Sequence, residues 1–430
     1  MVEKIKIADG ITLNVISTEK FKTNYLSVNF VNYLDADKVS LYALVPQVLI
    51  RGTKKHDSMA KLKIALDELY AASVEGRVYK RGEYQVCGLT ASWLADRYAI
   101  DGTAITEGAL DILEELLFEP YTENGCFSKS YTESEKQDLI DDIRALINNK
   151  NSYAVRRCKQ EMFKGEAYGI SEYGTEESVG AITPESLYKA YNEMLEASAI
   201  EIFYVGGGDV AKLTDRIRSL FANRKRSFKP LKRTEVSHGV QSVREVTERI
   251  SASQGKLSLG FRIGSSVADS EYRAFPVLVE MYANSPVSKL FMNVREKLSL
   301  CYYCRAIPDG VKGVMIVSSG IEVANKQKAQ DEILAQLEDI KQGRITEDEL
   351  VLAKKSLKNA YCELDDSPVA LEGWYLTRRL SGLDDDHGAV CDRLMEVTLD
   401  EVVEAANRIK LDTVYFLEGT QGGEEEEDDE

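Results

Sequence analysis

Histidine is the residue most often used to bind zinc or to move protons near neutral pH, and this chain of 430 residues has three: His56, His238 and His387. No two of them lie within ten residues of each other. Two histidines bind one zinc ion from a single helix face only when they are about four residues apart. The chain therefore has no histidine pair of that kind. His56 lies in a polar segment and His387 follows three aspartates, so we expect solvated loops rather than catalytic sites.

Cys301 and Cys304 form a CxxC motif, whose chemistry depends on what accompanies it. A zinc ribbon needs a second such pair, which the chain lacks. A thioredoxin-type site needs the pair at the N-terminus of a helix, whereas this stretch has strand character. We expect two packed thiols whose sulfurs the strand holds apart. The seven cysteines are scattered and odd in number, which predicts reduced thiols in a cytoplasmic protein.

The charge balance argues against some classes of partner. Lys and Arg number 54 and Asp and Glu 71, which gives a net charge of −17. The last seven residues, 424–430, are all acidic, so the rest of the chain carries −10. This balance disfavours a protein that coats nucleic acid or an anionic membrane. A basic stretch at 224–233 has no aromatic platform beside it, and we interpret it as part of a linker.

No apolar run approaches the ~18 residues of a membrane helix. Residues 1–7 alternate apolar and polar side chains, which does not fit a secretory signal.

Hydrophobic periodicity predicts strands and helices in alternation along the first half. Alternating residues around Asp9 and Gly10 predict a hairpin. Thr183 followed by Pro184 predicts a helix start, and the glycines at 206–208 lack a phosphate-binding motif and predict a turn. The expected strands are 5–15, 25–31, 76–92 and 200–205, and the expected helices are 39–50, 59–70, 103–117, 133–149 and 184–196.

The second half repeats the first. Residues 256–261 are similar to 25–30, and three identities share an offset of 215 residues: Thr183/Thr398, Ala190/Ala405 and Asn192/Asn407. This pattern predicts a duplication that gives an α+β fold of two homologous domains, each a mixed or antiparallel sheet with helices packed on one face. We place the domains at 1–222 and 246–420, joined by a basic linker at 223–245 and followed by an acidic disordered tail at 421–430.

Four segments carry a resemblance to a known family. They are residues 45–53, 167–191, 202–206 and 285–302, and the last, SPVSKLFMNVREKLSLCY, is the most specific. The sequence resembles the M16 (insulinase or pitrilysin-like) peptidases of the short bacterial and mitochondrial-processing type, over nearly all of residues 1–420. The resemblance implies a two-domain clamshell half and accounts for the repeat.

In that family an HxxEH helix binds zinc with its two histidines and polarises the attacking water with its glutamate. The resemblance places Ala43 and Gln47 at the histidine positions and Pro46 at the glutamate. Ala43 has no donor atom, Gln47 is a poor zinc ligand and Pro46 cannot exchange a proton. Pro46 also removes a helical N–H, so we expect this helix to bend or to start late.

The third-ligand position of the family falls at Asp142, which shares a helix face with Glu135. A carboxylate alone cannot rebuild a zinc site, and a solvated acidic face is the plainer interpretation of these two residues.

The resemblance also implies that Arg295 and Tyr302 hydrogen-bond the substrate backbone near the scissile carbonyl. The alternative left open is an Arg–Glu surface pair beside a core tyrosine. Tyr303 competes locally with Tyr302, because neighbouring residues of a strand point to opposite faces.

These observations predict a non-catalytic, substrate-binding subunit of a heterodimeric M16-type zinc metallopeptidase that acts on unfolded peptides. We expect no enzyme activity from the chain alone and no cofactor on it, with zinc carried by a sibling M16 subunit. The expected partners are that sibling and a peptide, with neither nucleic acid nor membrane. The alternative is a non-peptidase scaffold or interaction protein derived from the same fold, for example in a protein-modification pathway.

Overall fold

The computed structural model describes residues 2–222, 224–236 and 239–420. Contacts divide the chain into two compact units. Unit 1 contains the residues up to Arg144 together with Ile170–Lys232, and unit 2 contains Ala145–Gly169 together with the residues from Arg233 onward. The boundary at 232/233 falls inside the predicted linker. The predicted tail at 421–430 lies outside the described residues.

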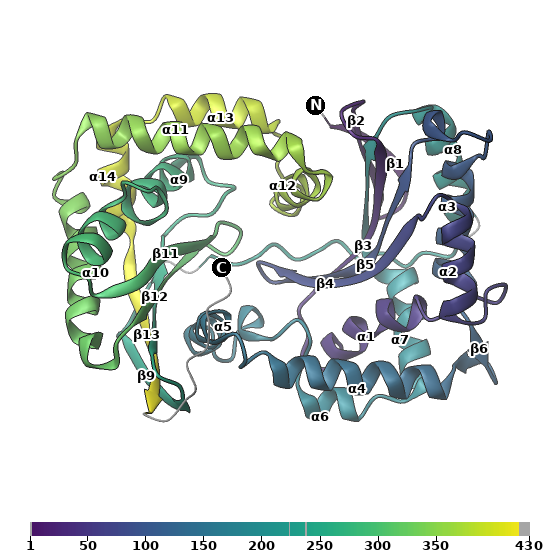
Figure 1. Ribbon diagram of the computed structural model, residues 1–430, viewed down its shortest axis with the longest axis horizontal. Coiled ribbons are helices and arrows are strands. Elements are labelled where there is room, and N and C mark those ends of the chain that lie inside the picture. The colour runs from purple at the N-terminus through teal and green to yellow at the C-terminus, as the bar shows by residue number, and fades with distance from the viewer. Residues whose placement is uncertain (1, 223, 237–238, 421–430) are drawn as a thin grey trace. The chain divides into compact units, whose positions relative to one another are not determined.

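The sheet of unit 1 has six strands in the order β1-β2-β8-β3-β5-β4 (Figure 1). Strands β2 and β8 are parallel and the other neighbours are antiparallel, so the sheet is mixed as predicted. The predicted hairpin turns at Gly10, whose φ of 67° suits a residue without a Cβ. The strands are β1 (Glu3–Ala8), β2 (Ile11–Ser17), β3 (Thr23–Tyr33), β4 (Ser73–Arg81), β5 (Tyr84–Leu94) and β8 (Ala199–Gly206).

The helices of unit 1 cover one face of this sheet. Leu26, Val28 and Phe30 of β3 join the apolar core with the helices, whereas the alternating Ser27 and Asn29 point to the other face. The helices are α1 (Val39–Leu49), α2 (Met59–Glu68), α3 (Ile105–Phe118), α4 (Lys129–Ala145), α6 (Glu176–Gly180), α7 (Pro184–Ala197) and α8 (Val210–Phe221), with a short hairpin of β6 (Thr122–Glu123) and β7 (Cys126–Phe127).

The sheet of unit 2 repeats this topology. Its five strands run β11-β12-β10-β13-β9, and only β13 and β9 are parallel. Read from its other end, this order matches β2-β8-β3-β5-β4 strand for strand, as a duplication predicts. The strands are β9 (Arg244–Ser251), β10 (Gly255–Arg262), β11 (Cys301–Asp309), β12 (Val314–Ile321) and β13 (Lys410–Thr420).

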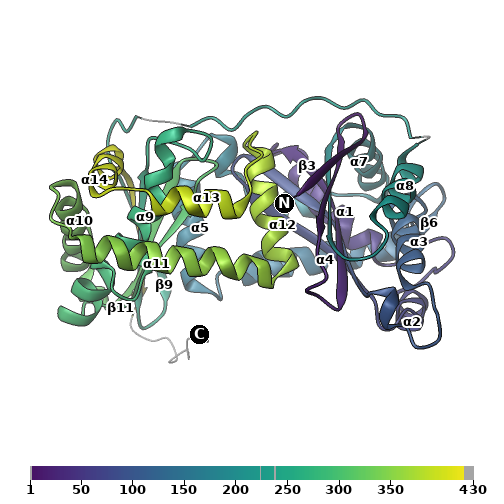
Figure 2. The same cartoon turned by 90° about the horizontal axis from the view of Figure 1, so that it is seen from above.

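Helices cover both faces of the second sheet. Leu257, Leu259 and Phe261 of β10 pack with the helices that follow them in sequence, and α11 and α13 run side by side in both views (Figures 1 and 2). The helices are α9 (Ala274–Val279), α10 (Lys326–Lys341), α11 (Glu347–Glu363), α12 (Pro368–Leu380), α13 (His387–Met395) and α14 (Leu399–Arg408), with two π-helical segments at Glu280–Asn284 and Leu290–Lys297.

The opposite face of that sheet is covered by α5 (Lys150–Met162), a helix that the sequence analysis did not predict and whose residues it placed in the first domain. Ala154, Cys158 and Met162 form one apolar stripe on α5 and pack against Ile316 and Leu417. The chain therefore leaves unit 1 after α4, adds one helix to unit 2 and returns.

Capping boxes form at Thr183, the predicted helix start, and at Thr398, its equivalent in the repeat. The Thr183 hydroxyl accepts the Ser186 N–H in α7, and the Thr398 hydroxyl accepts the Glu401 N–H in α14. Among the described residues, no helix combines the length and the apolar character that a membrane span requires.

Candidate functional site

Helix α1 holds three of the four positions that correspond to the metal site. It begins at Val39, well before Pro46, so of the two expected effects of this proline, a bend or a late start, the late start is wrong. Ala43 is 1% exposed and packs in the core, and Pro46 is also buried. Gln47 is half-buried, and a Cβ at Gly76 of β4 would lie 3.1 Å from its side-chain oxygen. The edge strand β4 therefore packs directly against this turn of α1.

Asp142, the fourth position, is exposed on α4. The described part of the chain contains no group of three or more His, Cys, Asp or Glu side chains arranged to hold a metal ion. With an alanine and a proline buried in the helix and a lone exposed carboxylate on α4, these residues do not fit a zinc ion.

Glu135 lies two helical turns before Asp142 on α4, and an arginine neutralises its charge. Arg51 Nη1 lies 2.9 Å from Glu135 Oε1, and the two side chains are 23% and 12% exposed. The guanidinium also lies over the Tyr131 ring, 5.1 Å from its centroid. Burial raises the pKa of Glu135, the Arg51 charge opposes that rise and the Asp142 charge adds to it. Sequence reasoning missed Arg51, although it directly follows the apolar helix.

The described histidines are packed rather than solvated. His56 Nδ1 lies 2.8 Å from Glu115 Oε2, which also accepts the Thr53 hydroxyl, and this fastens the loop after α1 to α3. His387 begins α13, where Nδ1 lies 3.0 Å from the Tyr375 hydroxyl. The expectation of solvated loops is thus wrong for both residues. His238 lies outside the described residues.

Arg295 lies at the exposed side of the π-helical segment Leu290–Lys297, which Leu290 and Val294 anchor in the core. Its side chain is 46% exposed, stacks over the Phe291 ring at 5.0 Å and lies 3.6 Å from the Glu296 carboxylate. Such an exposed pair contributes little to stability. The guanidinium is therefore accessible to a ligand and is not enclosed in the core.

A sharp turn leads from this segment to β11. Ser299 has a φ of 50°, a left-handed conformation that is uncommon for a residue with a Cβ. The Leu298 N–H donates to the Asn293 carbonyl, which closes the last π-helical turn, and the Leu300 N–H donates to the Val294 carbonyl beyond it. π-Turns and left-handed residues of this kind are frequent at functional sites.

Tyr302 is the extra residue of a β-bulge at the start of β11. The strand register shifts between Cys301, opposite Ile321, and Tyr303, opposite Gly320. Tyr302 is 51% exposed, and its hydroxyl has no hydrogen-bond partner among the described residues. The bulge thus turns this phenol toward solvent.

Tyr303, the competing tyrosine, is held in place. Its hydroxyl donates to Asn151 Oδ1 at 2.7 Å, and its ring fills the space that a Cβ at Gly320 would occupy. Of the two tyrosines, Tyr302 is the one available to a ligand.

The bulge also changes the geometry of the CxxC motif. Cys301 lies opposite Ile321 and Cys304 opposite Ser319, so both side chains point to the same face. The neighbouring Cys304 thiol lowers the pKa of Cys301. The prediction that the strand separates the two sulfurs is wrong, because it assumed a strand without a bulge.

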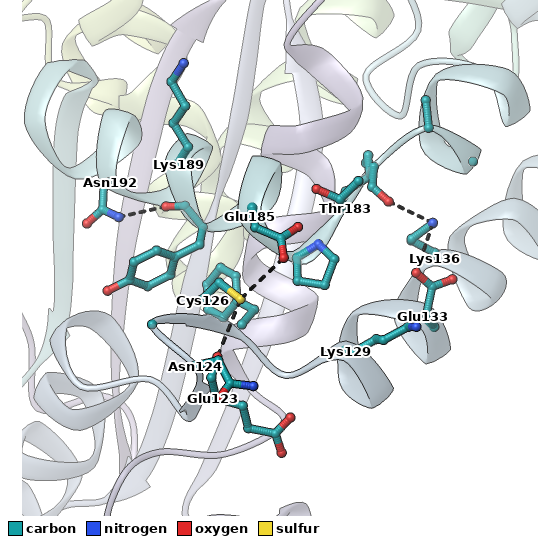
Figure 3. Close-up of a pocket in the computed structure, with 17 residues that line it drawn as sticks. Glu123, Asn124, Cys126, Lys129, Glu133, Lys136, Thr183, Glu185, Lys189 and Asn192 are labelled. Atoms are coloured by element: carbon teal, nitrogen blue, oxygen red, sulfur yellow. Dashed lines mark hydrogen bonds and ion pairs between the residues drawn. The ribbon is translucent and has the colours of Figure 1, made fainter.

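The largest cavity described in unit 1, about 930 Å³, contains none of the predicted site residues. The β6–β7 hairpin, the first turns of α4 and the start of α7 enclose it (Figure 3). Cys126 points into it, 3.9 Å from Glu185 Oε1, and Lys136 donates to the Ile182 carbonyl at its rim. Three lysines and three glutamates line it, so its charge favours neither cations nor anions.

Comparison with known proteins places the chain in a family. Residues 181–357 match the sequence profile of the peptidase M16 inactive domain. The chain is 33% identical to the probable inactive metalloprotease YmfF of Bacillus subtilis over 96% of its own length and 97% of the relative's. It is 22% identical to the antilisterial bacteriocin subtilosin biosynthesis protein AlbE of Bacillus subtilis over 68% of its length and 72% of the relative's.

Among solved structures, a conserved protein from Enterococcus faecalis V583 is similar, with a TM-score of 0.89, 29% identity, and coverage of 98% of this chain and 100% of that one. Together with the two sheets of common topology and the helix α1 that lacks metal donors, these similarities show that the chain belongs to the M16 peptidase family, as an inactive member.

Proposed function

We propose that this chain is the non-catalytic, peptide-binding subunit of a two-subunit M16 peptidase, whose sibling subunit carries the zinc. The observation that carries the proposal is the contrast between two sets of residues. The metal positions on α1 have lost their donors, whereas Arg295 and Tyr302 keep an exposed guanidinium and an exposed phenol. A protein that no longer bound peptides would gain nothing from keeping these two groups accessible.

The chemistry of the two groups suits a peptide backbone. An arginine side chain offers five N–H donors and remains charged, and a tyrosine hydroxyl offers one donor. Both bind carbonyl oxygens, which every peptide presents regardless of its sequence. A ligand held in this way is selected by its extended, unfolded state rather than by its side chains.

The edge strand β4 of unit 1 supports the same proposal. It is the last strand of its sheet, and among the described strands it pairs only with β5. An extended peptide can add to such an edge through backbone hydrogen bonds. By contrast, the Asn284 side chain already bonds the Ala306 N–H and C=O of β11, which closes part of that edge.

The test is reconstitution. The chain is purified alone and together with an HxxEH-bearing M16 protein from a neighbouring gene, and cleavage of unstructured peptides is measured. We expect cleavage from the mixture and none from this chain, because only the sibling holds the hydrolytic metal.

Three variants make the test specific. Arg295→Ala and Tyr302→Phe should each lower kcat/KM of the mixture by about tenfold, equal to ~1.4 kcal/mol of lost binding. Arg305→Ala removes another exposed arginine of β11 and should leave activity unchanged. Equal activity of all three variants would contradict a role for the pair, and failure of the two chains to associate would favour the alternative.

That alternative is a scaffold or interaction protein outside proteolysis. The similarity to AlbE favours it, because that relative is named for the biosynthesis of a bacteriocin. A scaffold binds another folded protein rather than an unfolded peptide. Copurification of a stable partner without HxxEH, combined with no effect of Arg295→Ala, would support it.

A further inference from the structure

The bulge at Tyr302 brings together two thiols of unequal character. Cys301 is half-buried, whereas Cys304 is only 8% exposed. On a regular strand, residues three apart point to opposite faces, but one inserted residue restores them to the same face. Both side chains pack on the apolar core of unit 2.

The surroundings of the pair distinguish the two sulfurs chemically. The neighbouring Cys304 thiol, and then the Ser319 hydroxyl and the Arg295 charge, lower the pKa of Cys301 against the effect of burial. The neighbouring Cys301 and burial raise the pKa of Cys304 well above its usual value. Cys301 therefore has more thiolate and better access to solvent, which are the properties of an attacking thiol.

We propose that Cys301 and Cys304 are a redox-active pair that forms a reversible disulfide by exchange with a low-molecular-weight disulfide such as oxidised glutathione. The Cys301 thiolate attacks one sulfur of the small disulfide, forms a mixed disulfide and releases one small thiolate. The Cys304 thiol then loses its proton to solvent and attacks the Cys301 sulfur, which releases the second small thiolate. Two protein thiols are oxidised and one small disulfide is reduced to two thiols.

The other cysteines of unit 1 and unit 2 lack this arrangement. Burial raises the pKa of Cys87 and, in unit 2, that of Cys158. Cys126 faces a cavity beside Glu185, and burial and that carboxylate raise its pKa. Cys362 is exposed and lies near Cys391, whose pKa burial raises, so this second pair is a control within the same molecule.

The experiment uses the full-length protein in glutathione buffers of increasing oxidised fraction. Remaining thiols are alkylated, and the protein is digested with trypsin. Cleavage after Lys297 and after Arg305 gives one peptide, residues 298–305, that contains both cysteines and no others. In oxidising buffer we expect this peptide to be two hydrogens lighter and to carry no alkylating group, because its two thiols have formed a disulfide. The peptides of Cys362 and Cys391 should carry only glutathione or the alkylating group.

Two variants separate the roles of the sulfurs. In Cys304→Ser, Cys301 should accumulate as the mixed disulfide with glutathione, because no resolving thiol remains. In Cys301→Ser, the buried Cys304 should stay unmodified. The proposal is overturned if Cys301 and Cys304 of the wild-type protein stay reduced, or carry glutathione separately, in a buffer that modifies Cys362. Disulfide formation at this pair does not require that the chain bind peptides, so each proposal can fail without the other.

Discussion

At the scale of single residues, an ion pair joins the segment after α1 to helix α4. Arg51 and Glu135 bond across 2.9 Å between the loop after α1 and helix α4. Burial disfavours the charged form of Glu135, and the positive charge of Arg51 partly offsets this effect. The pair therefore holds the end of α1 against α4.

Arg51→Ala should lower the free energy of unfolding by about 1–3 kcal/mol at neutral pH, because it leaves a half-buried carboxylate without its cation. The variant should also raise the pKa of Glu135 further. A raised pKa in the folded state makes ionisation costly, so stability is lost as the pH rises through that pKa and is regained at acidic pH. Urea unfolding of both proteins at several pH values measures this.

The loss of unfolding free energy caused by Arg51→Ala should shrink toward zero below pH ~4, where Glu135 is protonated in the folded and unfolded states. A deficit of constant size at all pH values would show that Arg51 acts through its packing on Tyr131 and not through its charge. Glu135→Gln in the same background is the matched control and should recover most of the loss.

Some residue-scale features were readable from the sequence and others were not. The loss of donors at Ala43, Pro46 and Gln47 is a matter of residue type, so a sequence is sufficient to see it. The choice between Tyr302 and Tyr303 depends on a bulge, and an inserted residue leaves no mark in the hydrophobic pattern because both tyrosines suit a strand. The pairing of Arg51 with Glu135 spans 84 residues and follows only from the fold.

At the scale of elements, the assignment of α5 is the clearest difference between prediction and structure. The apolar residues of α5 have helical spacing. Such spacing predicts that one face of the helix is buried, but it does not indicate which sheet buries that face. The predicted first domain, 1–222, included the residues of α5 without a helix there, whereas the stripe of α5 packs on β10, β12 and β13. Gly260 permits this contact, since a Cβ there would lie 3.0 Å from Met162 Sδ and 3.3 Å from Cys158 Sγ.

Gly260→Ala should therefore destabilise unit 2 by about 1–3 kcal/mol through overpacking against α5. Thermal unfolding followed by circular dichroism measures the change. Gly180→Ala is the control, because a Cβ at Gly180 meets nothing within 4 Å, and it should not destabilise the protein. Equal stability of Gly260→Ala and wild type would show that α5 does not pack closely on β10.

The helix starts were predictable because their signals are local. Thr183 and Thr398 each cap a helix through a residue three positions later, and both capping boxes form. The π-helical segment before Tyr302 was not predictable, since it depends on how Leu290 and Val294 are buried in unit 2. Local signals were thus sufficient to predict where helices begin, whereas tertiary packing determines where a helix becomes irregular.

At the scale of the whole molecule, the duplication connects sequence to function. The offset of 215 residues between matching cap residues predicted two similar domains, and the two sheets share one strand order. In that order β4 of unit 1 corresponds to β11 of unit 2. The first lies against the helix that lacks metal donors, and the second carries the Tyr302 bulge near its start. The two repeats thus share one framework and differ at equivalent edges.

The central claim is that this chain binds unfolded peptides through Arg295 and Tyr302. Fluorescence anisotropy of a labelled unstructured peptide, titrated with the purified chain, tests it most directly. We predict saturable binding that Arg295→Ala and Tyr302→Phe each weaken about tenfold and that Arg305→Ala leaves unchanged. No binding by the wild type, or equal weakening in all three variants, would contradict the claim.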